Sequence, residues 1–325
     1  METEKPLACW TGMEEYRGSV LRCLTVIFRT AGCAWNRCRM CGYRHERYPP
    51  LPPGALEERI LAQLAWLQER HPSSSFEMVK IFTSGSFLDA NEVPCPVQDA
   101  IAASFRGKLV IAESRPEYVD AARMEELMGK VDDGTWDQPL YVAMGLETTN
   151  DNIREKCIDK GHTFADFKDA AGRAHKGGAG TKAYLLLKPP FLTESEAIAD
   201  MHHSIREASP YSEILSMNLC TVQKGTEVEQ YWRQGAYRPP YLWSVLAVLG
   251  QATVHVQCDP VGGGHPRGPH NCGTCDREIV RGIRQYSLSR DRDLVLALLE
   301  EHCGCKEEWE YVLEEEMPFC TPLTR

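Results

Sequence analysis

Three cysteines near the start of the chain have a spacing that could hold an iron-sulfur cluster. The segment CAWNRCRMCGY places Cys33, Cys38 and Cys41 in a CxxxxCxxC pattern. Thiolates are the usual protein ligands of these clusters, and three of them on one loop can bind three irons of a 4Fe-4S cubane. The fourth iron then stays open to another ligand, so the pattern predicts a site of chemistry.

Two other interpretations of this spacing remain open. A plant-type 2Fe-2S ferredoxin shares the spacing but needs a fourth cysteine, and the next one, Cys95, follows a predicted helix and a predicted strand. A structural zinc site also needs a fourth ligand, for which His45 is the nearest candidate. The open cluster is favoured because it requires no fourth protein ligand.

A second group of cysteines lies near the C-terminus. Cys272 and Cys275 form a CxxC pair, and Cys303 and Cys305 form a CxC pair about thirty residues later. Two close pairs separated by a helix-length insertion are typical of a structural zinc site with four cysteine ligands. A second iron-sulfur cluster is the main alternative, and some of these cysteines could simply be small buried side chains.

Three further potential ligands, Cys258, His265 and His270, are close enough in sequence to replace one of these pairs. The remaining cysteines have no partner at metal-ligand spacing, and we expect them to be free thiols. They are Cys9, Cys23, Cys95, Cys157, Cys220 and Cys320.

The composition indicates a cytoplasmic globular protein. The 325 residues are 43% hydrophobic and 25% charged, which is ordinary for a domain with a buried core. METEKPLACW lacks the features of a secretory signal, and no apolar run is long enough to span a membrane. Fourteen cysteines in a reducing compartment favour metal or cluster binding over disulfides.

The elements that must position these residues follow a βα rhythm. Helical spacing is clear between the first two predicted strands, where Leu56, Ile60, Leu64 and Leu67 share one face. Repeated βα units predict a parallel sheet, and six of them predict a partial TIM-like (β/α)6 barrel of the α/β class. The predicted strands span residues 24–28, 78–83, 108–112, 140–146, 182–188 and 214–219.

Beyond about residue 235 the pattern changes. RPPYLW opens a helix, and DPVGGGHPRGPHNCGTC is a loop rich in Gly, Pro, His and Cys. We therefore predict a core domain over residues 1–235 and a small C-terminal metal-binding subdomain over residues 236–325. Within the latter, residues 291–302 and the segment EEWEYVLEEE are predicted to be helical.

The cluster motif, directly after a predicted strand, resembles that of the radical S-adenosylmethionine (SAM) superfamily. The usual motif is CxxxCxxC followed by an aromatic residue. Here the first gap is one residue longer, and Gly42 separates Cys41 from the aromatic Tyr43. The resemblance implies that SAM binds the open iron and that Tyr43 lies against its adenine.

Three more segments fit this resemblance, and each follows a predicted strand, where a barrel places its ligand-binding groups. The first is the turn of Thr83, Ser84, Gly85 and Ser86. The resemblance implies that this turn takes the methionine amino group of SAM. Alone, such a segment is more often an ordinary turn.

The other two segments are ESRPEY and LETTNDNIREKCIDKGH. The resemblance implies that Glu113 and Arg115 meet the ribose or amino group and the carboxylate of SAM, and that Glu147 lies near the same pocket. Taken singly, a Glu and Arg pair is more often a surface ion pair. Lys188 and Asn218, at the ends of the fifth and sixth predicted strands, are either further contacts or ordinary loop residues.

The closest resemblance is to the radical SAM subunit of archaeosine synthase, which is related to the Elongator-type radical SAM domain. It covers about residues 20–305 and includes the phrases FTSGSFLD and CDPVGGGHPRGPHNCGTCD. It implies a tRNA substrate with a lysine-bearing 7-deazaguanine at position 15, whose lysine C-N bond is cleaved through a 5'-deoxyadenosyl radical to form archaeosine. It also implies a partner subunit similar to tRNA-guanine transglycosylase and an electron donor.

Two alternative functions remain. One is another radical SAM enzyme of tRNA modification, of the methylthiolation or carboxymethylation type. The other is a non-catalytic iron-sulfur or zinc adaptor of a tRNA-modifying complex. The net charge of −10 argues against a uniformly basic nucleic-acid binder, but a local patch of Arg267, Arg277, Arg281 and Arg284 could help hold tRNA.

Overall fold

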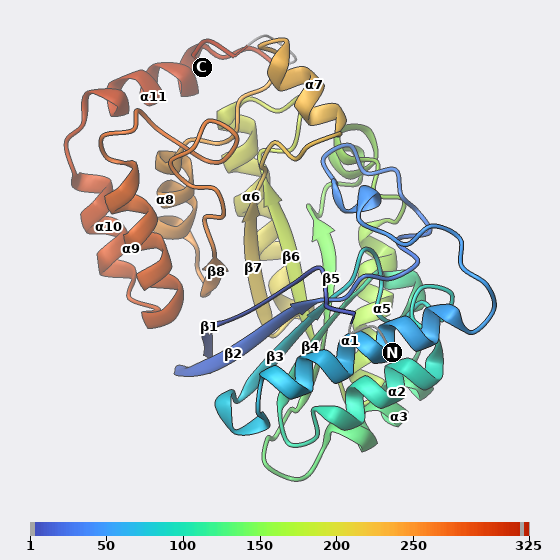
Figure 1. Cartoon of the computed structure of the whole chain (residues 1–325). Helices are drawn as coiled ribbons and strands as arrows, with labels where there is room; N and C mark the ends of the chain where they lie inside the picture. Colours follow the sequence, from blue (N-terminus) through green and yellow to red (C-terminus); the bar gives the residue numbers. More distant parts are fainter. Residues whose placement is uncertain (1–3, 319–321, 325) are drawn as a thin grey trace.

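The strands form one curled sheet that makes the wall of a half-barrel (Figure 1). The computed structural model describes residues 4–318 and 322–324. In this part of the chain the eight-stranded sheet runs in sequence order, and all neighbouring strands from β2 onward are parallel. The strands are β1 (Ala8–Tyr16), β2 (Ser19–Ile27), β3 (Met78–Phe82), β4 (Leu109–Ser114), β5 (Leu140–Glu147), β6 (Gly180–Leu187), β7 (Ile214–Leu219) and β8 (Val256–Cys258).

All six predicted strands are present as β2 to β7, and the prediction of a partial TIM-like barrel is confirmed. Two strands were not predicted. β1 pairs antiparallel with β2 through a two-residue turn, in which Arg17 and Gly18 have φ angles of +48° and +85°. Such a turn suits the twist of a hairpin but usually contains Asn-Gly or Asp-Gly, so its sequence signal is weak. β8 has only three residues and pairs with β7.

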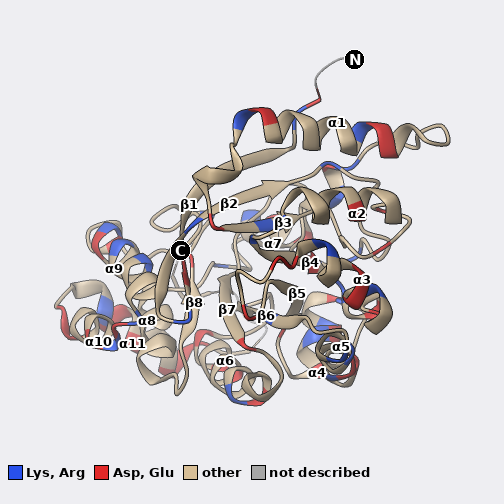
Figure 2. Cartoon of the chain, turned by 90° about the horizontal axis from the view of Figure 1, so that it is seen from below, with Lys and Arg blue, Asp and Glu red and all other residues tan. Residues whose placement is uncertain are grey.

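Helices cover the outer face of the sheet, as the end-on view of the strands shows (Figure 2). The large apolar core lies between the two layers and includes Val79 and Ile81 of β3 and Leu185 and Leu187 of β6. None of the described helices is long and apolar enough to cross a membrane. The helices are α1 (Ala55–Arg70), α2 (Cys95–Ser104), α3 (Ala121–Val131), α4 (Asp151–Ile153), α5 (Phe164–Lys176), α6 (Glu194–Ala208), α7 (Glu227–Arg233), α8 (Leu242–Gln251), α9 (Asp276–Ser289), α10 (Arg292–Glu300) and α11 (Gly304–Glu315).

Local sequence determines where several of these helices begin. α5 and α6 start with capping boxes in which Thr163 pairs with Asp166 and Thr193 pairs with Glu196. α1 follows the turn at Gly54 and buries the predicted apolar face. Each helix returns the chain to the edge of the sheet where the strands begin. The carboxyl ends of the parallel strands therefore lie together at the opposite edge, with the loops that carry the candidate site.

The inner face of the sheet carries a smaller apolar cluster. It includes Tyr16, Tyr141 and Tyr184, and the hydroxyl groups of Tyr16 and Tyr141 lie 3.0 Å apart. Side chains alternate between the two faces of a strand. Lys80 and Lys182 therefore point to this inner face, between the residues that pack against the helices.

The C-terminal helices α8 to α11 gather beside the β8 edge of the sheet (Figure 1). α8, α10 and α11 match the helices predicted from RPPYLW, from residues 291–302 and from EEWEYVLEEE. The sheet itself continues past Gly235, because β8 pairs with β7. The division into residues 1–235 and 236–325 remains a prediction.

Candidate cofactor site and metal centre

The three N-terminal cysteines lie on one loop directly after β2. The Cys38 side chain is buried, and Cys33 and Cys41 are half-buried. The backbone N–H of Cys41 donates to the carbonyl oxygen of Cys38 at 3.2 Å. Burial raises the pKa of the Cys38 thiol to about 11, while the charge of Lys160 opposes this rise. The loop thus presents three thiols beside a buried cation.

The loop is held against the segment that follows β5. The indole N–H of Trp35 donates to the carbonyl oxygen of Asp159 at 2.6 Å, and the backbone N–H of Arg39 donates to that of Ile158 at 2.9 Å. A Cβ atom on Gly161 would lie only 2.3 Å from the Trp35 ring. Gly161 also has a φ of +76°, so a glycine is needed there for both the turn and the ring.

On its other side the loop contacts the segment after β7. The backbone N–H of Gly42 donates to Oε1 of Gln223 at 2.5 Å, and the Arg39 guanidinium pairs with Glu227 at 2.5 Å. His45, the alternative zinc ligand, contacts the carbonyl oxygen of Gly225 at 3.3 Å. The loop is therefore fixed at both sides before any cofactor binds.

The predicted Gly-rich turn after β3 packs directly on this loop. A Cβ atom on Gly85 would lie 2.4 Å from the Cα of Cys33 and 2.4 Å from a carboxylate oxygen of Glu92. Only glycine permits this approach. The backbone N–H of Gly85 donates to the hydroxyl oxygen of Thr83 at 3.1 Å, which fixes the turn internally.

Glu92 joins the turn to the start of the cysteine loop, and sequence reasoning missed it. One carboxylate oxygen accepts from the Thr30 hydroxyl at 2.6 Å, and the other accepts from the Ser86 backbone N–H at 2.6 Å. Burial raises the pKa of this carboxyl group, although both hydrogen bonds lower it. Nothing local in the sequence marks Glu92, because its partners are distant or backbone groups.

Arg115 is buried at the end of β4 and lies beside the same turn. Its backbone N–H donates to the hydroxyl oxygen of Ser86 at 3.1 Å. Its guanidinium pairs with Glu117 at 2.5 Å and lies 5.5 Å from the centre of the Trp35 ring. Arg115 thus lies inside the protein, against the cysteine loop, and not on the outer surface of the barrel.

Two buried polar atoms here have no hydrogen-bond partner among the described residues. They are Nη2 of Arg115 and the hydroxyl oxygen of Ser84. Buried polar groups are almost always paired, so an unpaired donor and hydroxyl in one place indicate a missing polar ligand. Both residues belong to the predicted SAM pocket, and this observation fits a ligand with carboxylate and amino groups.

Glu113, Glu147 and Tyr43 complete the predicted pocket. Burial raises the pKa of Glu113 to about 7; the Lys160 charge opposes the rise, and Glu147 adds to it. Burial and the charges of Glu113 and Cys41 raise the pKa of the Tyr43 hydroxyl to about 12. These charge effects place Glu147 and Tyr43 in the neighbourhood of Glu113.

Lys160 lies at the centre of these groups and was not predicted. Its Nζ is 2.7 Å from Oε1 of Glu147, and a Cβ atom on Gly145 would lie 2.5 Å from the same Nζ. Its charge acts on Cys38, Cys41 and Glu113. The sequence gives no signal for this role, because Lys160 looks like an ordinary loop lysine in IDKGH.

Lys188 and Asn218, left undecided by the sequence, have different surroundings. The Nζ of Lys188 is buried and pairs with Glu194 at 2.5 Å. Asn218 is exposed at the end of β7.

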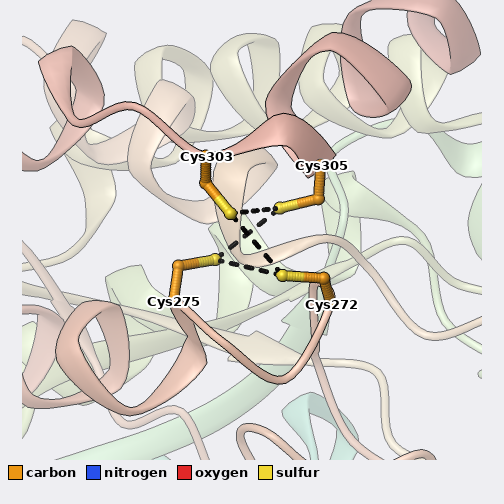
Figure 3. A group of neighbouring side chains, drawn as sticks. All are labelled: Cys272, Cys275, Cys303 and Cys305. Carbon is orange, nitrogen blue, oxygen red and sulfur yellow. Dashed lines mark hydrogen bonds between the residues drawn. The ribbon is translucent and has the colours of Figure 1, made fainter.

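The four C-terminal cysteines converge on one point (Figure 3). Four of their Sγ–Sγ distances are 4.0 Å for Cys272 to Cys275, 3.6 Å for Cys272 to Cys303, 3.7 Å for Cys275 to Cys305 and 3.4 Å for Cys303 to Cys305. A tetrahedral ion with metal–sulfur bonds of about 2.3 Å requires sulfur atoms about 3.8 Å apart. The geometry fits one ion.

Two N–H groups support the sulfur atoms from outside. The indole N–H of Trp243 donates to Sγ of Cys305 at 3.3 Å, and the Asn271 amide donates to Sγ of Cys275 at 3.4 Å. Oδ1 of Asn271 in turn accepts from the backbone N–H of Leu242 at 2.9 Å. Such outer partners orient metal ligands, and here they join the sulfur group to the start of α8.

Among the described residues, these four form the one group whose ligand atoms converge in this way. Cys258 is buried in β8, where its backbone contacts Ser287, and His270 contacts the carbonyl oxygen of Gly268. The expected free thiols Cys9, Cys23, Cys95, Cys157 and Cys220 form no disulfide bond. Cys320 lies outside the described residues.

Comparison with known proteins gives two close relatives. The chain is 42% identical to the archaeosine synthase subunit beta of Methanosarcina acetivorans, over 99% of this chain and 94% of the relative. It is 37% identical to the archaeosine synthase subunit beta of Thermococcus kodakarensis, over 94% of this chain and 96% of the relative. The chain belongs to the archaeosine synthase subunit beta family. The resemblance inferred from the motifs is thereby confirmed.

The other comparisons give less information about the function of this family member. An uncharacterized protein of Methanocaldococcus jannaschii is 33% identical over 99% of this chain and 90% of its own length. No family model matches the chain. A queuine lyase from Clostridium spiroforme, solved with SAM and queuine, is 14% identical over 64% of this chain and 78% of its own, with a TM-score of 0.47. A likeness of that size does not bear on the activity.

Proposed function

We propose that this chain is a radical SAM enzyme whose 4Fe-4S cluster is held by Cys33, Cys38 and Cys41. The observation that carries the proposal is the unpaired Arg115 Nη2 and Ser84 hydroxyl beside the cysteine loop. Three thiolates leave one iron open, and the unpaired groups suit the carboxylate and amino groups of SAM. When bound, the cluster supplies the electron that breaks the SAM sulfonium bond, giving a 5'-deoxyadenosyl radical.

The residues of the chain then bind and orient the cofactor. Arg115 is suited to the methionine carboxylate, because a guanidinium can bind it with two parallel hydrogen bonds. The turn of Ser84, Gly85 and Ser86 offers hydroxyl groups and bare backbone to the amino group. Glu113 and Tyr43 face the rest of the cofactor, with Tyr43 against the adenine.

Glu147 and Lys160 form a buried ion pair that brings a positive charge to the predicted pocket. Their ion pair is buried, with side-chain exposures of 8% for Glu147 and 15% for Lys160. The Lys160 ammonium stands beside the cluster thiolates, so it offsets part of the negative charge that three thiolates bring into a buried place. This arrangement favours a cluster over three separate free thiols.

We further propose that the substrate is a modified tRNA base. The two relatives bear the name archaeosine synthase subunit beta. We infer from this name and from the motifs that the chain cleaves the lysine C-N bond of a lysine-bearing 7-deazaguanine at tRNA position 15, which leaves the formamidine of archaeosine. The word subunit supports a partner protein, for which a transglycosylase-like subunit is our proposal, and the reaction also requires an electron donor.

For the C-terminal site we propose one structural zinc ion bound by Cys272, Cys275, Cys303 and Cys305. The support is the set of sulfur distances, all within about 0.4 Å of the tetrahedral spacing. In a cubane each cysteine binds its own iron, so the sulfur atoms would stand farther apart. This argues against the auxiliary cluster that a sulfur-inserting relative would need.

The test uses the reconstituted, reduced protein with its partner subunit and tRNA bearing the lysine-modified base. The expected products are archaeosine in the tRNA and one 5'-deoxyadenosine per turnover. Cys41→Ser is the matched variant and should give neither product. Consumption of SAM with a free small molecule but not with this tRNA would refute the substrate proposal and leave the radical chemistry standing.

A further inference from the structure

Two lysines project into the barrel below the cofactor pocket, and the proposed chemistry does not use them. Lys80 of β3 has a side-chain exposure of 15%, and Lys182 of β6 is 3% exposed. Both share the inner face of the sheet with Tyr184, whose ring centre lies 5.2 Å from the Lys182 Nζ. Buried ammonium groups are costly unless something pairs with them.

The two lysines are paired in different ways. Lys80 forms an ion pair with Glu14 of β1. Lys182 donates to a neutral group, Oε1 of Gln257, at 2.8 Å, and Gln257 is itself held by the carbonyl oxygen of Glu15 at 2.8 Å. Within the described residues, Lys182 has no carboxylate partner at ion-pair distance.

Nearby charges do not fully offset the burial of Lys182. Burial lowers the pKa of Lys182 to about 8, and the neighbouring Glu14 charge offsets only part of that effect. An ammonium has three donors, and the Gln257 amide oxygen occupies one. A ligand carboxylate beside Lys182 would therefore give this ammonium the charged partner that the protein itself does not provide.

The inner face of the sheet, which carries Tyr184, runs from this place to the cofactor end. Tyr184 is buried on this face: burial raises the pKa of its hydroxyl, and the charges of Glu113, at the cofactor end, and of Glu14, near Lys182, add to the rise. The ring of Phe82 lies beside it, with 6.4 Å between ring centres. Lys182 is two residues before Tyr184 on β6, a rise of about 6.6 Å along the strand.

The rise from Lys182 to Tyr184 is close to the length of a lysine side chain. Four C–C bonds separate the ε-carbon of lysine from its α-carbon, which spans about 5 Å when extended. If the ε-carbon lies at the cofactor end, where its C-N bond is cleaved, the α-carbon reaches toward Lys182. The α-carboxylate and α-ammonium groups then arrive at one cation and one carboxylate, Lys182 and Glu14.

We propose that the bottom of the barrel is a binding site for the amino-acid end of the substrate's lysine arm. Lys182 binds the α-carboxylate, and Glu14, fixed by Lys80, accepts from the α-ammonium. This inference rests on the proposed function, because it assumes the lysine-bearing base. It adds a reason for substrate choice, since a base without the arm cannot fill the site.

The experiment compares two tRNA substrates that differ only in the carboxylate. One carries the lysine-modified base, and the other carries the same base modified with 1,5-diaminopentane, which lacks the α-carboxylate. The wild-type protein should lose about 10- to 100-fold in kcat/KM on the second substrate, as expected for a lost hydrogen bond between charged groups. SAM binding and the cluster spectrum should stay unchanged.

Lys182→Met removes the ammonium and keeps most of the length of the side chain. It should lose a similar factor on the lysine substrate but show little further loss on the diaminopentane substrate, because the same contact is missing in both. Lys176→Met, on the exposed face of α5, is the matched control and should behave as wild type.

Three results overturn the proposal. The wild type could show no preference between the two substrates, or Lys182→Met could lose equally on both, which indicates a structural lysine. If the wild type processes neither substrate, the proposed function itself falls, and this site with it. Should Lys182→Met fail to fold, the wild-type comparison of the two substrates decides alone.

Discussion

Replacing Gly85 by alanine perturbs the contact on which the candidate site depends. The added Cβ would lie 2.4 Å from the Cα of Cys33 and 2.7 Å from its Cβ. Ordinary carbon contacts begin near 3.4 Å, so the turn and the cysteine loop must separate by about 1 Å. The contact atoms of Cys33 include backbone, which cannot move aside as a flexible side chain could.

The separation should affect the cluster more than the fold. Overpacking of this kind costs about 1–3 kcal/mol of stability, which the protein can survive. A displacement of about 1 Å in a positioned site, however, can reduce catalysis about 100-fold. We therefore expect Gly85→Ala to fold, to bind less iron and to bind SAM more weakly.

The assay measures iron and sulfide content, the EPR signal after reduction and SAM affinity, alongside thermal unfolding. Gly172→Ala is the matched control, because an added Cβ there meets no heavy atom within 4 Å. In a helix that change should be neutral or stabilising by up to about 1 kcal/mol. Full cluster loading and unchanged SAM affinity in Gly85→Ala would show that the turn and the loop do not form one site.

Three further changes have definite expected outcomes. Burial raises the pKa of Asp200 from 3.8 to about 6, so the stability contributed by its neutral form is full below about pH 4 and is lost as the pH rises through 6. Asp200→Asn should remove about 3 kcal/mol of this pH dependence of the free energy of unfolding, measured with urea. An unchanged pH dependence in the variant would contradict the assignment. Cys303→Ser should abolish the binding of about one zinc per chain and lower the melting temperature, whereas iron in place of zinc in the wild type would indicate a second cluster. Changing Arg281 and Arg284 together to alanine should weaken tRNA binding and reduce its salt dependence, and unaltered binding would remove α9 from the tRNA surface.

The four arginines predicted to help hold tRNA lie on two different segments. Arg277, Arg281 and Arg284 all lie on α9, where Figure 2 shows basic segments along the helix. Arg267 lies elsewhere, held to Glu229 at 2.5 Å. Arg281 and Arg284 also have carboxylate partners, Glu278 at 3.4 Å and Asp259 at 3.5 Å, so the role of these arginines in tRNA binding remains a prediction.

Much of the framework could be predicted because its signals are local. Apolar runs identified β2 to β7, and the spacing of two cysteine pairs identified the sulfur group near the C-terminus. The strand order of a βα barrel then placed Ser84, Glu113 and Glu147 at one edge. Each of these inferences needs only a short window of sequence and one general rule of folding.

The residues that were missed act over long range. Glu92 contacts Thr30, 62 residues away, and Lys160 reaches cysteines on a loop that precedes it by more than a hundred positions. The close approach of Gly161 to Trp35 depends on how two loops pack. No periodicity or motif encodes such contacts, so they become visible only once the chain is folded.

The formation of 5'-deoxyadenosine tests the central claim most directly. The reconstituted protein is reduced with dithionite in the presence of SAM, and 5'-deoxyadenosine and methionine are quantified. We expect both products from the wild type and neither from Cys33→Ala, Cys38→Ala or Cys41→Ala. SAM cleavage that persists in a variant lacking all three cysteines would contradict the account, as would a fully loaded wild-type cluster that leaves SAM intact.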